Sequence, residues 1–149
     1  MMVSTKSDYA TRALQDLALH YEQGPVQIEG IARRQGLPAR YLEQVLLMLK
    51  RGGLLLSKRG VNGGYYLAKP PCEITIGEIL RIVDGPVAPI FCVTDGKREV
   101  CPMEGMCALQ DLWSEVRDAV DKIVDRTTLE DISQRVRAKQ GAARVSYHI

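Results

Sequence analysis

Apolar side chains recur every three or four positions along the first fifty residues, which is the period of helices that bury one face. Glycine-containing turns interrupt this pattern and divide it into three helices. Ser7 or Asp8 is suited to cap the first helix, and Pro38 suits the first turn of the third, where its missing N–H needs no partner. The helices are predicted over residues 7–22, 27–35 and 38–51.

Two short apolar runs follow the third helix. The runs 54–59 and 65–68 flank a turn of glycine and asparagine at 60–64, which predicts a β-hairpin with Lys58 and Arg59 at its tip. Glycine-rich turns also occur in phosphate-binding loops, which is an alternative interpretation of residues 60–64. This turn lacks their Gly-Lys-Ser/Thr ending and precedes a strand, so we reject that interpretation.

The second half of the chain has a different pattern. Thr75 and Glu78 have the spacing of a capping box, which predicts a helix over 76–84. Residues 86–107 contain three prolines and show no helical or strand period, so they form a predicted loop. A continuous apolar stripe then predicts a helix over 108–126, about 28 Å long. We expect a second copy of the chain to cover this stripe, because so small a domain cannot.

The predicted fold class is mainly α with a small β-hairpin, a winged helix-turn-helix plus a long dimerisation helix. A last short helix starts at Thr128, and the chain ends in a mobile tail. The predicted regions are a winged helix-turn-helix DNA-binding region over 1–71, a linking helix and cysteine loop over 72–107, the dimerisation helix and short terminal helix over 108–137, and the tail over 138–149.

Charge divides the chain unevenly although the net charge is only +2. Residues 1–69 carry ten Lys and Arg against five Asp and Glu, whereas residues 70–149 carry ten against thirteen. This asymmetry indicates that the first half faces a polyanion, with solubility as the simpler alternative. The start of the chain has no apolar signal segment and no run reaches the roughly 20 apolar residues of a membrane span, so we expect a cytoplasmic protein.

The order of three helices and a basic hairpin predicts double-stranded DNA as the partner. The third helix would enter the major groove, where Gln44 is suited to adenine, Arg40 to guanine or phosphate and Glu43 to cytosine. Arg59 is suited to a narrow minor groove. The alternative is that these basic residues are only a solvated face. The candidate DNA-binding residues are Ala39, Arg40, Tyr41, Glu43, Gln44, Lys58, Arg59 and Gly60.

Four cysteines in a chain without a secretion signal favour metal or redox chemistry over structural disulfides. Cys92, Cys101 and Cys107 lie in the predicted loop, separated by eight and by five residues. Thiolates bind zinc or iron–sulfur clusters, and zinc sites pair cysteines at a closer spacing than this. We interpret the three as cluster ligands, with a cluster-free thiol switch or a zinc-stabilised DNA binder as alternatives. Cys72, beside Pro71, is interpreted as a buried or spare thiol.

Catalysis has little support in the sequence. The two histidines are His20, inside the first helix, and His148, in the tail, so no Cys/His or Ser/His/Asp arrangement is evident. An electron-transfer module of ferredoxin type would need cluster ligands but neither a basic wing nor a recognition helix. We therefore expect a protein that is not an enzyme.

From Thr5 to about Ile132 the chain resembles the Rrf-two (Rrf2) family of regulators, the group of IscR, NsrR and RirA. The resemblance implies a homodimeric repressor or activator with a 2Fe-2S or 4Fe-4S cluster, whose long helices cross at the dimer interface. The matching segments are Tyr41-Leu42-Glu43-Gln44, Ser57-Lys58-Arg59-Gly60, Gly63-Gly64-Tyr65, Ile76-Gly77-Glu78-Ile79, the three cysteines before Leu112-Trp113, and Thr128-Leu129.

The resemblance also bears on the fourth cluster ligand. IscR-like members have a histidine three residues after the last cysteine, where this chain has Gln110, a poor ligand. NsrR-like members use an aspartate near the N-terminus of the other subunit, and Asp8 stands at the matching place. The resemblance thus implies Asp8 as the fourth ligand, with an ordinary helix cap or first-turn acid as the alternative. It leaves open whether cluster supply, nitric oxide, oxygen or iron is the signal.

Overall fold

The predicted order of helices and strands is confirmed by a computed structural model, which describes residues 2–95 and 100–147. The two strands pair antiparallel from Leu55 opposite Leu67 to Lys58 opposite Gly64. In the described part of the chain the helices and strands are α1 (Thr5–Leu19), α2 (Ile28–Gln35), α3 (Ala39–Arg51), β1 (Leu55–Lys58), β2 (Gly64–Leu67), α4 (Ile76–Asp84), α5 (Ala108–Arg126) and α6 (Leu129–Tyr147).

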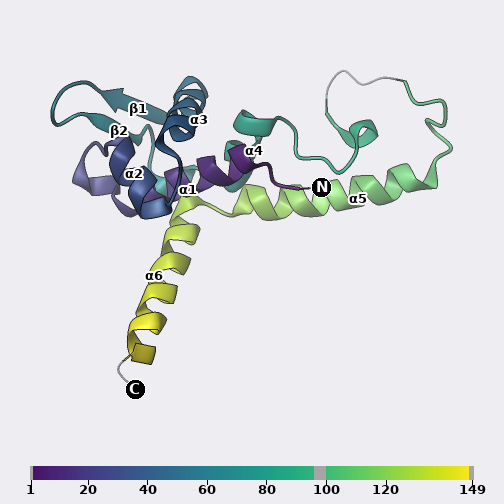
Figure 1. The fold of residues 1–149 in the computed structure, drawn as a ribbon. Helices are drawn as coiled ribbons and strands as arrows, with labels where there is room; N and C mark the ends of the chain where they lie inside the picture. The colour runs from purple at the N-terminus through teal and green to yellow at the C-terminus, as the bar shows by residue number, and fades with distance from the viewer. Residues whose placement is uncertain (1, 96–99, 148–149) are drawn as a thin grey trace.

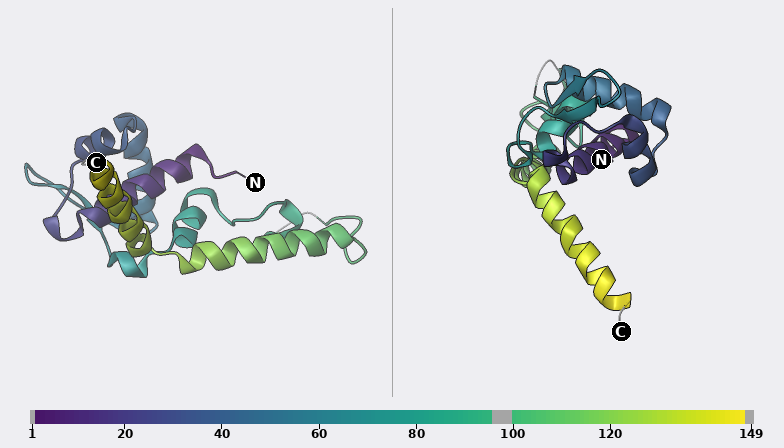
Figure 2. Two further views of the ribbon diagram at one scale, coloured as in Figure 1. Left: turned by 90° about the horizontal axis from the view of Figure 1, so that it is seen from below. Right: turned by 90° about the vertical axis from the view of Figure 1, so that its left-hand side faces the viewer.

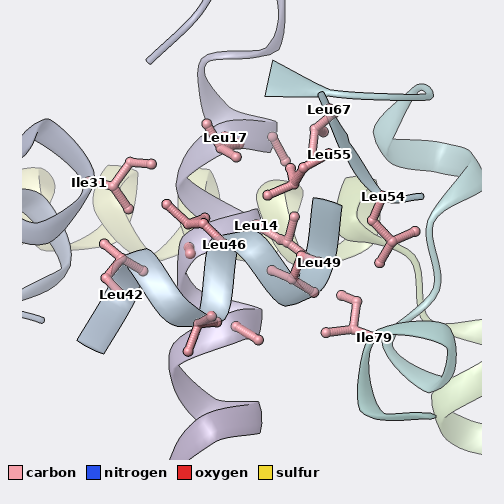
Figure 3. Packing of buried hydrophobic residues seen from close by; sticks show 14 of the residues in the cluster. Leu14, Leu17, Ile31, Leu42, Leu46, Leu49, Leu54, Leu55, Leu67 and Ile79 are labelled. Atoms are coloured by element: carbon pink, nitrogen blue, oxygen red, sulfur yellow. The ribbon is translucent and has the colours of Figure 1, made fainter. Parts of the chain in front are cut away.

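Aliphatic side chains from α1, α3, the hairpin and α4 meet in one hydrophobic core (Figure 3). Leu14, Leu46, Leu55 and Ile79 have no exposed surface there. Burying one such side chain contributes about 1.5–3 kcal/mol, so these contacts fix α3 and the wing relative to α1. Leu129, the first residue of α6, is also part of this cluster.

Helix α1 begins earlier and ends earlier than the predicted 7–22. Its cap is Ser4, whose hydroxyl accepts a hydrogen bond from the Ser7 N–H at 3.0 Å, so the prediction of a Ser7 or Asp8 cap is wrong. Ser7 is instead buried and donates its hydroxyl to the Asp84 carboxylate at 2.6 Å. The helix stops at Leu19, and a separate 3-10 turn over Tyr21–Gln23 completes the predicted segment.

The turn between α2 and α3 explains the placement of Pro38. Gly36 adopts the left-handed conformation at φ 64°, which ends α2 and which a glycine adopts without strain. Leu37 is then buried, and Pro38 precedes the first helical residue as the N-cap of α3. Pro38 therefore lies one position before the first turn in which it was predicted.

Helix α4 leads into the predicted loop. The Thr75 hydroxyl accepts from the Glu78 N–H at 3.1 Å, which confirms half of the predicted capping box. The Glu78 carboxylate accepts from Lys69 at 2.8 Å. In the described part of 86–107, the regular structure is one 3-10 turn over Phe91–Val93, which is named η3 here, and this confirms the irregular segment.

Helix α5 has the predicted bounds, whereas α6 is longer than predicted. Thr128 and Asp131 cap α6 reciprocally, with the Thr128 N–H donating to the carboxylate at 2.8 Å and the Asp131 N–H donating to the hydroxyl at 3.2 Å. The helix then continues to Tyr147, so the prediction of a short helix followed by a tail over 138–149 is wrong for 138–147; residues 148–149 lie outside the described residues. Alanine, arginine, lysine and glutamine dominate this extension and favour helix without a buried face.

Helices α5 and α6 extend away from the N-terminal unit in different directions (Figures 1 and 2). Only the first part of α6 reaches the core, and its C-terminal end stands clear of the rest of the chain (Figure 2). Within the described ranges, no helix combines the length and apolarity that crossing a bilayer requires.

Candidate DNA-binding surface and cysteine segment

Helix α3 separates a buried face from a face available to a partner. Leu42 and Val45 are buried, whereas Arg40, Glu43 and Gln44 are exposed. Ala39, the first helical residue, is exposed as well. A major groove is read by exposed side chains at the start of such a helix, so these four predicted residues have the accessibility that the role needs.

Tyr41 differs from its neighbours on α3. It is half-buried, and its ring packs edge-on against Tyr9 of α1, with centroids 5.3 Å apart and planes 83° apart. Edge-to-face pairs of this kind contribute about 0.5–1.5 kcal/mol beyond area burial. Tyr41 thus supports the orientation of α3 through the aromatic contact.

A buried carboxylate holds α2 against α1. Asp16 is 1% exposed, and Arg34 donates to both of its oxygens, Nε to Oδ1 at 2.9 Å and Nη2 to Oδ2 at 2.7 Å. This hydrogen bonding to Asp16 raises the pKa of the Arg34 guanidinium, against the opposing effect of burial. Gln35 adds a third hydrogen bond at 3.3 Å. Sequence reasoning missed this contact, although an acid inside the apolar stripe of the first helix was a signal for it.

The wing is attached to the segment before α2. Val26 and Tyr65 exchange two backbone hydrogen bonds, each 2.8 Å long, which extends the hairpin by one bridge. Gly64, at φ 148°, lies so close to the Val26 backbone that a Cβ there would collide with it. The Gln27 side-chain amide donates to the Val61 carbonyl at 3.2 Å. The wing loop is therefore fixed to the residues that lead into α2, which is the first helix of the helix-turn-helix.

The predicted residues of the wing tip are all accessible. Lys58, Arg59 and Gly60 are exposed. Behind them, the Lys50 ammonium at the end of α3 donates to the Ser57 hydroxyl of β1 at 2.6 Å. Two exposed cations, one at the end of β1 and one in the turn that follows it, are a surface on which phosphate groups can bind.

The predicted cluster ligands lie on three different pieces of chain. Cys92 is in η3, Cys101 is in the irregular segment and Cys107 is the N-cap residue of α5. Each of these three cysteines is half-buried. Cys72 is exposed, so the interpretation of Cys72 as a buried thiol is wrong and that of a spare thiol is left. All four cysteines are described, and none forms a disulfide. Among the described residues, no group of three or more His, Cys, Asp or Glu side chains is gathered closely enough to hold a metal ion.

Asp8 stands apart from the cysteines as a first-turn acid of α1. Its carboxylate is 54% exposed and pairs with Arg12, one turn along the same helix, at 3.5 Å. Three thiols within sixteen residues of sequence fit the chemistry of iron–sulfur ligation, but in the described part of the chain they do not lie close together. The described residues thus supply the donor types without gathering them into one site.

Helix α5 leaves its apolar stripe uncovered. None of its nineteen residues is buried, and Leu109, Leu112 and Ile123 are 60%, 46% and 65% exposed. Helix α5 is joined to α4 by polar contacts. Arg81 of α4 donates to the carboxylates of Asp125 at 2.6 Å and Asp121 at 2.7 Å. Hydrogen bonding to Asp125 first, and then to Asp121, raises the pKa of Arg81 against the effect of burial.

Three helices, a hairpin fixed to them and an exposed recognition-helix face define a winged helix-turn-helix protein. Residues 3–135 match the Rrf2 family, which is described as an iron-dependent transcriptional regulator. The chain therefore belongs to the Rrf2 family, and it is a DNA-binding transcriptional regulator and not an enzyme.

Relatives at similar levels of identity carry different names. The chain is 36% identical over 142 residues to the HTH-type transcriptional regulator CymR of Bacillus subtilis (strain 168), covering 95% of this chain and 96% of that protein. The solved structure of CymR, the global cysteine regulator of B. subtilis, has a TM-score of 0.79 at 36% identity and covers 91% of this chain and 98% of that one.

Two IscR proteins are also similar to the chain. The HTH-type transcriptional regulator IscR of Pectobacterium carotovorum subsp. carotovorum (strain PC1) is 36% identical over 132 residues, covering 89% of this chain and 79% of that protein. The solved structure of T. potens IscR has a TM-score of 0.76 at 34% identity and covers 94% of this chain and 91% of that one. These matches establish the fold and the class of regulator and leave the type of sensor undecided.

Proposed function

We propose that the start of α3 reads base edges in the major groove while the wing contacts the adjacent backbone or minor groove. The observation that carries this proposal is the exposure of Arg40, Glu43 and Gln44 on a helix whose opposite face is fully packed. Gln44 and Arg40 supply donors for purine edges, and Glu43 disfavours sequences that place phosphate or a second acceptor beside it. Lys58 and Arg59 supply the charge. Ala39 and Gly60 allow close approach, and Tyr41 holds the helix.

The DNA interface is tested with a fragment that the wild-type protein selects from a random-sequence pool. Arg59→Ala should weaken its binding about tenfold at one fixed salt concentration, because a wing cation is removed. Arg135→Ala is the matched control, since Arg135 is an exposed arginine of α6, which carries none of the proposed contacts. Equal losses for the two variants would reject the wing assignment.

We further propose that the regulator acts as a homodimer through α5. A helix of nineteen residues with no buried side chain and an apolar stripe is unfavourable in water unless a second surface covers it. A second copy presents the same stripe in a self-complementary way, which is the usual basis of two-fold dimers. Such pairing would bring two DNA-reading units into one molecule.

We also propose that Cys92, Cys101 and Cys107 hold an iron–sulfur cluster through which the regulator senses iron–sulfur status, nitric oxide or redox state. Three thiols in one irregular segment support this, as does the iron-dependent description of the family. When bound, the cluster supplies a group that oxidants and nitric oxide attack. Asp8 of the second subunit is proposed as the fourth ligand, and its exposure leaves it accessible for that role.

A cluster-free or zinc-bound thiol switch is the second candidate, and the separation of the three cysteines in the described chain favours its cluster-free form. The two are distinguished by anaerobic purification after expression with ample iron. The cluster proposal expects a coloured protein containing iron and sulfide, because iron–sulfur thiolates absorb visible light and zinc does not. Colourless protein with stoichiometric zinc, or with reactive thiols and no metal, would select the alternative.

Asp8→Ala tests the fourth ligand separately. The variant should fold and bind a cluster, but lose it faster than the wild type under air, because a carboxylate ligand is gone while three thiolates remain. Cys101→Ala should retain less cluster than Asp8→Ala. An unchanged cluster lifetime in Asp8→Ala would show that Asp8 is only a first-turn acid paired with Arg12.

A further inference from the structure

Cys92 lies in the single 3-10 turn η3, Phe91–Val93. Its internal hydrogen bonds run from the Val93 N–H to the Ile90 carbonyl at 3.3 Å and from the Thr94 N–H to the Phe91 carbonyl at 3.2 Å. Phe91 is 56% exposed, and Val93, at 3% exposed, is the buried member of the three-residue turn. One turn of 3-10 helix is not stable without tertiary contacts, so something outside it must hold it in place.

Arg117, in the middle of α5, supplies a polar contact of this kind beside the burial of Val93. Its Nη1 donates to the Val93 carbonyl oxygen at 2.8 Å, across twenty-four positions of sequence. The other edge of the guanidinium is held by Asp118, which accepts from Nε at 3.0 Å and from Nη2 at 2.8 Å. Nη1 also lies 3.6 Å from the Asp95 carboxylate. A charged donor with its orientation fixed on one side makes a stronger hydrogen bond to a carbonyl than a neutral donor does.

We propose that Arg117 is a positioning residue that anchors the Cys92 turn to α5, so that a chemical change at Cys92 alters the placement of α5. The proposal rests on the sensing role proposed above for the cysteine segment. Val93 follows Cys92 directly, and the anchored carbonyl belongs to it. Displacement of the Cys92 backbone by a ligand or a modification therefore pulls on the hydrogen bond from Arg117.

The contacts beyond Arg117 continue toward the DNA-binding unit. Asp121 lies one turn further along α5, and Asp125 lies one turn beyond Asp121. Both carboxylates accept hydrogen bonds from Arg81 of α4. Helix α4 contributes Ile79 to the core that also holds α3. A shift of α5 relative to the Cys92 turn thus reaches the elements that place the recognition helix, through contacts that a mutation can interrupt.

The anchor is tested first in the reduced, cluster-free, full-length protein. In Arg117→Ala, labelling of Cys92 by N-ethylmaleimide and hydrogen exchange of the Val93 and Thr94 amides should each accelerate about tenfold, because the turn opens more often. Arg117→Lys should restore part of the protection, since an ammonium also donates to the carbonyl. Lys122→Ala, an exposed cation on the same helix, should behave as wild type. Wild-type rates in Arg117→Ala would overturn the anchor.

The coupling is tested in a chain that keeps Cys92 as its one cysteine. Alkylation of Cys92 should change affinity for the selected DNA fragment when Arg117 is present and should leave it unchanged in Arg117→Ala. Equal changes with and without Arg117, or no change in either, would overturn the coupling. Because neither arm requires a cluster, a wild-type protein that binds no iron would reject the proposed cluster while leaving this result to decide the anchor.

Discussion

Helices α3 and α5 have the same kind of apolar stripe and opposite surroundings. Four of the thirteen residues of α3 are buried, whereas none of the nineteen residues of α5 is. The stripe of α3 is covered by α1, the hairpin and α4, whereas Leu109, Leu112 and Ile123 of α5 are exposed and α5 runs out beyond the N-terminal unit (Figure 1). An amphipathic pattern therefore specifies that a helix will be covered without specifying by which molecule. The core of the DNA-reading unit is complete in one chain, whereas by our proposal a second copy completes the α5 segment.

The largest expected difference comes from matched leucine truncations in the two helices. Leu46→Ala in α3 should lower the free energy of unfolding by about 3 kcal/mol at any protein concentration, because a fully buried side chain leaves a cavity. Leu112→Ala in α5, where the side chain is 46% exposed, should lower stability only to the extent that it weakens self-association. Urea unfolding at two protein concentrations measures both. A concentration-independent loss in Leu112→Ala as large as that of Leu46→Ala would show that Leu112 is covered within the single chain.

A smaller effect is expected from the buried ion pair within the DNA-reading unit. Asp16→Ala should cost about 1.5 kcal/mol of stability, since Arg34 loses both of its charged hydrogen bonds but, being 34% exposed, regains hydration. Asp8→Ala is the control on the same helix, because Asp8 forms an exposed pair with Arg12 and should cost less than about 0.5 kcal/mol. Thermal unfolding of the two variants compares them. Similar losses would show that the Asp16 pair is no stronger than a surface pair.

The smallest effect is a pH dependence at the junction between α1 and α4. Burial raises the pKa of Asp84, but hydrogen bonds from the hydroxyls of Ser4 and Ser7 outweigh it and hold that pKa below its ordinary value of 3.8. The contribution of Asp84 to stability is therefore present above that value and is lost as the pH falls through the lower, folded-state pKa. Because the group is largely exposed, the contribution is a few tenths of a kcal/mol.

Asp84→Asn isolates this contribution, since the amide does not ionise. The pH is lowered from 6 to 3 so that it passes through the range in which carboxyl groups ordinarily titrate. Over this interval the variant should lose less stability than the wild type. Asp131, whose pKa is lowered by hydrogen bonds from Thr128, titrates in both proteins and serves as an internal background. The same acid-induced loss in both proteins would place the pH dependence elsewhere.

The sequence predicted the elements well where local rules decide them. The bounds of α4 and α5 agree with the predicted ranges, because a capping threonine begins the one and a change from prolines to an apolar stripe begins the other. The start of α1 was not predictable from its local signals: Ser4 and Ser7 both suit a cap, and the choice depends on Asp84, seventy-seven positions from Ser7. The length of α6 was missed because it has no buried face to produce a period.

The candidate sites divide in the same way. Exposure of Arg40 and Gln44 follows from the helical period of the residues packed beneath them, so the sequence predicts it. The clamp between Asp16 and Arg34 and the anchor from Arg117 to Val93 join residues that no local pattern relates. Convergence of the three cysteines depends on a segment whose described residues have almost no regular structure and, by our proposal, on a second subunit.

The most direct test of the account is the affinity for the selected DNA fragment, measured anaerobically before and after exposure to nitric oxide. The affinity of the wild type should change about tenfold or more, which is within the usual range for coupling between two sites. Cys101→Ala should give one affinity under both conditions, because its cysteine segment no longer responds. An unchanged affinity in the wild type, or an equal change in Cys101→Ala, would contradict the claim that the cysteine segment controls the DNA-reading unit.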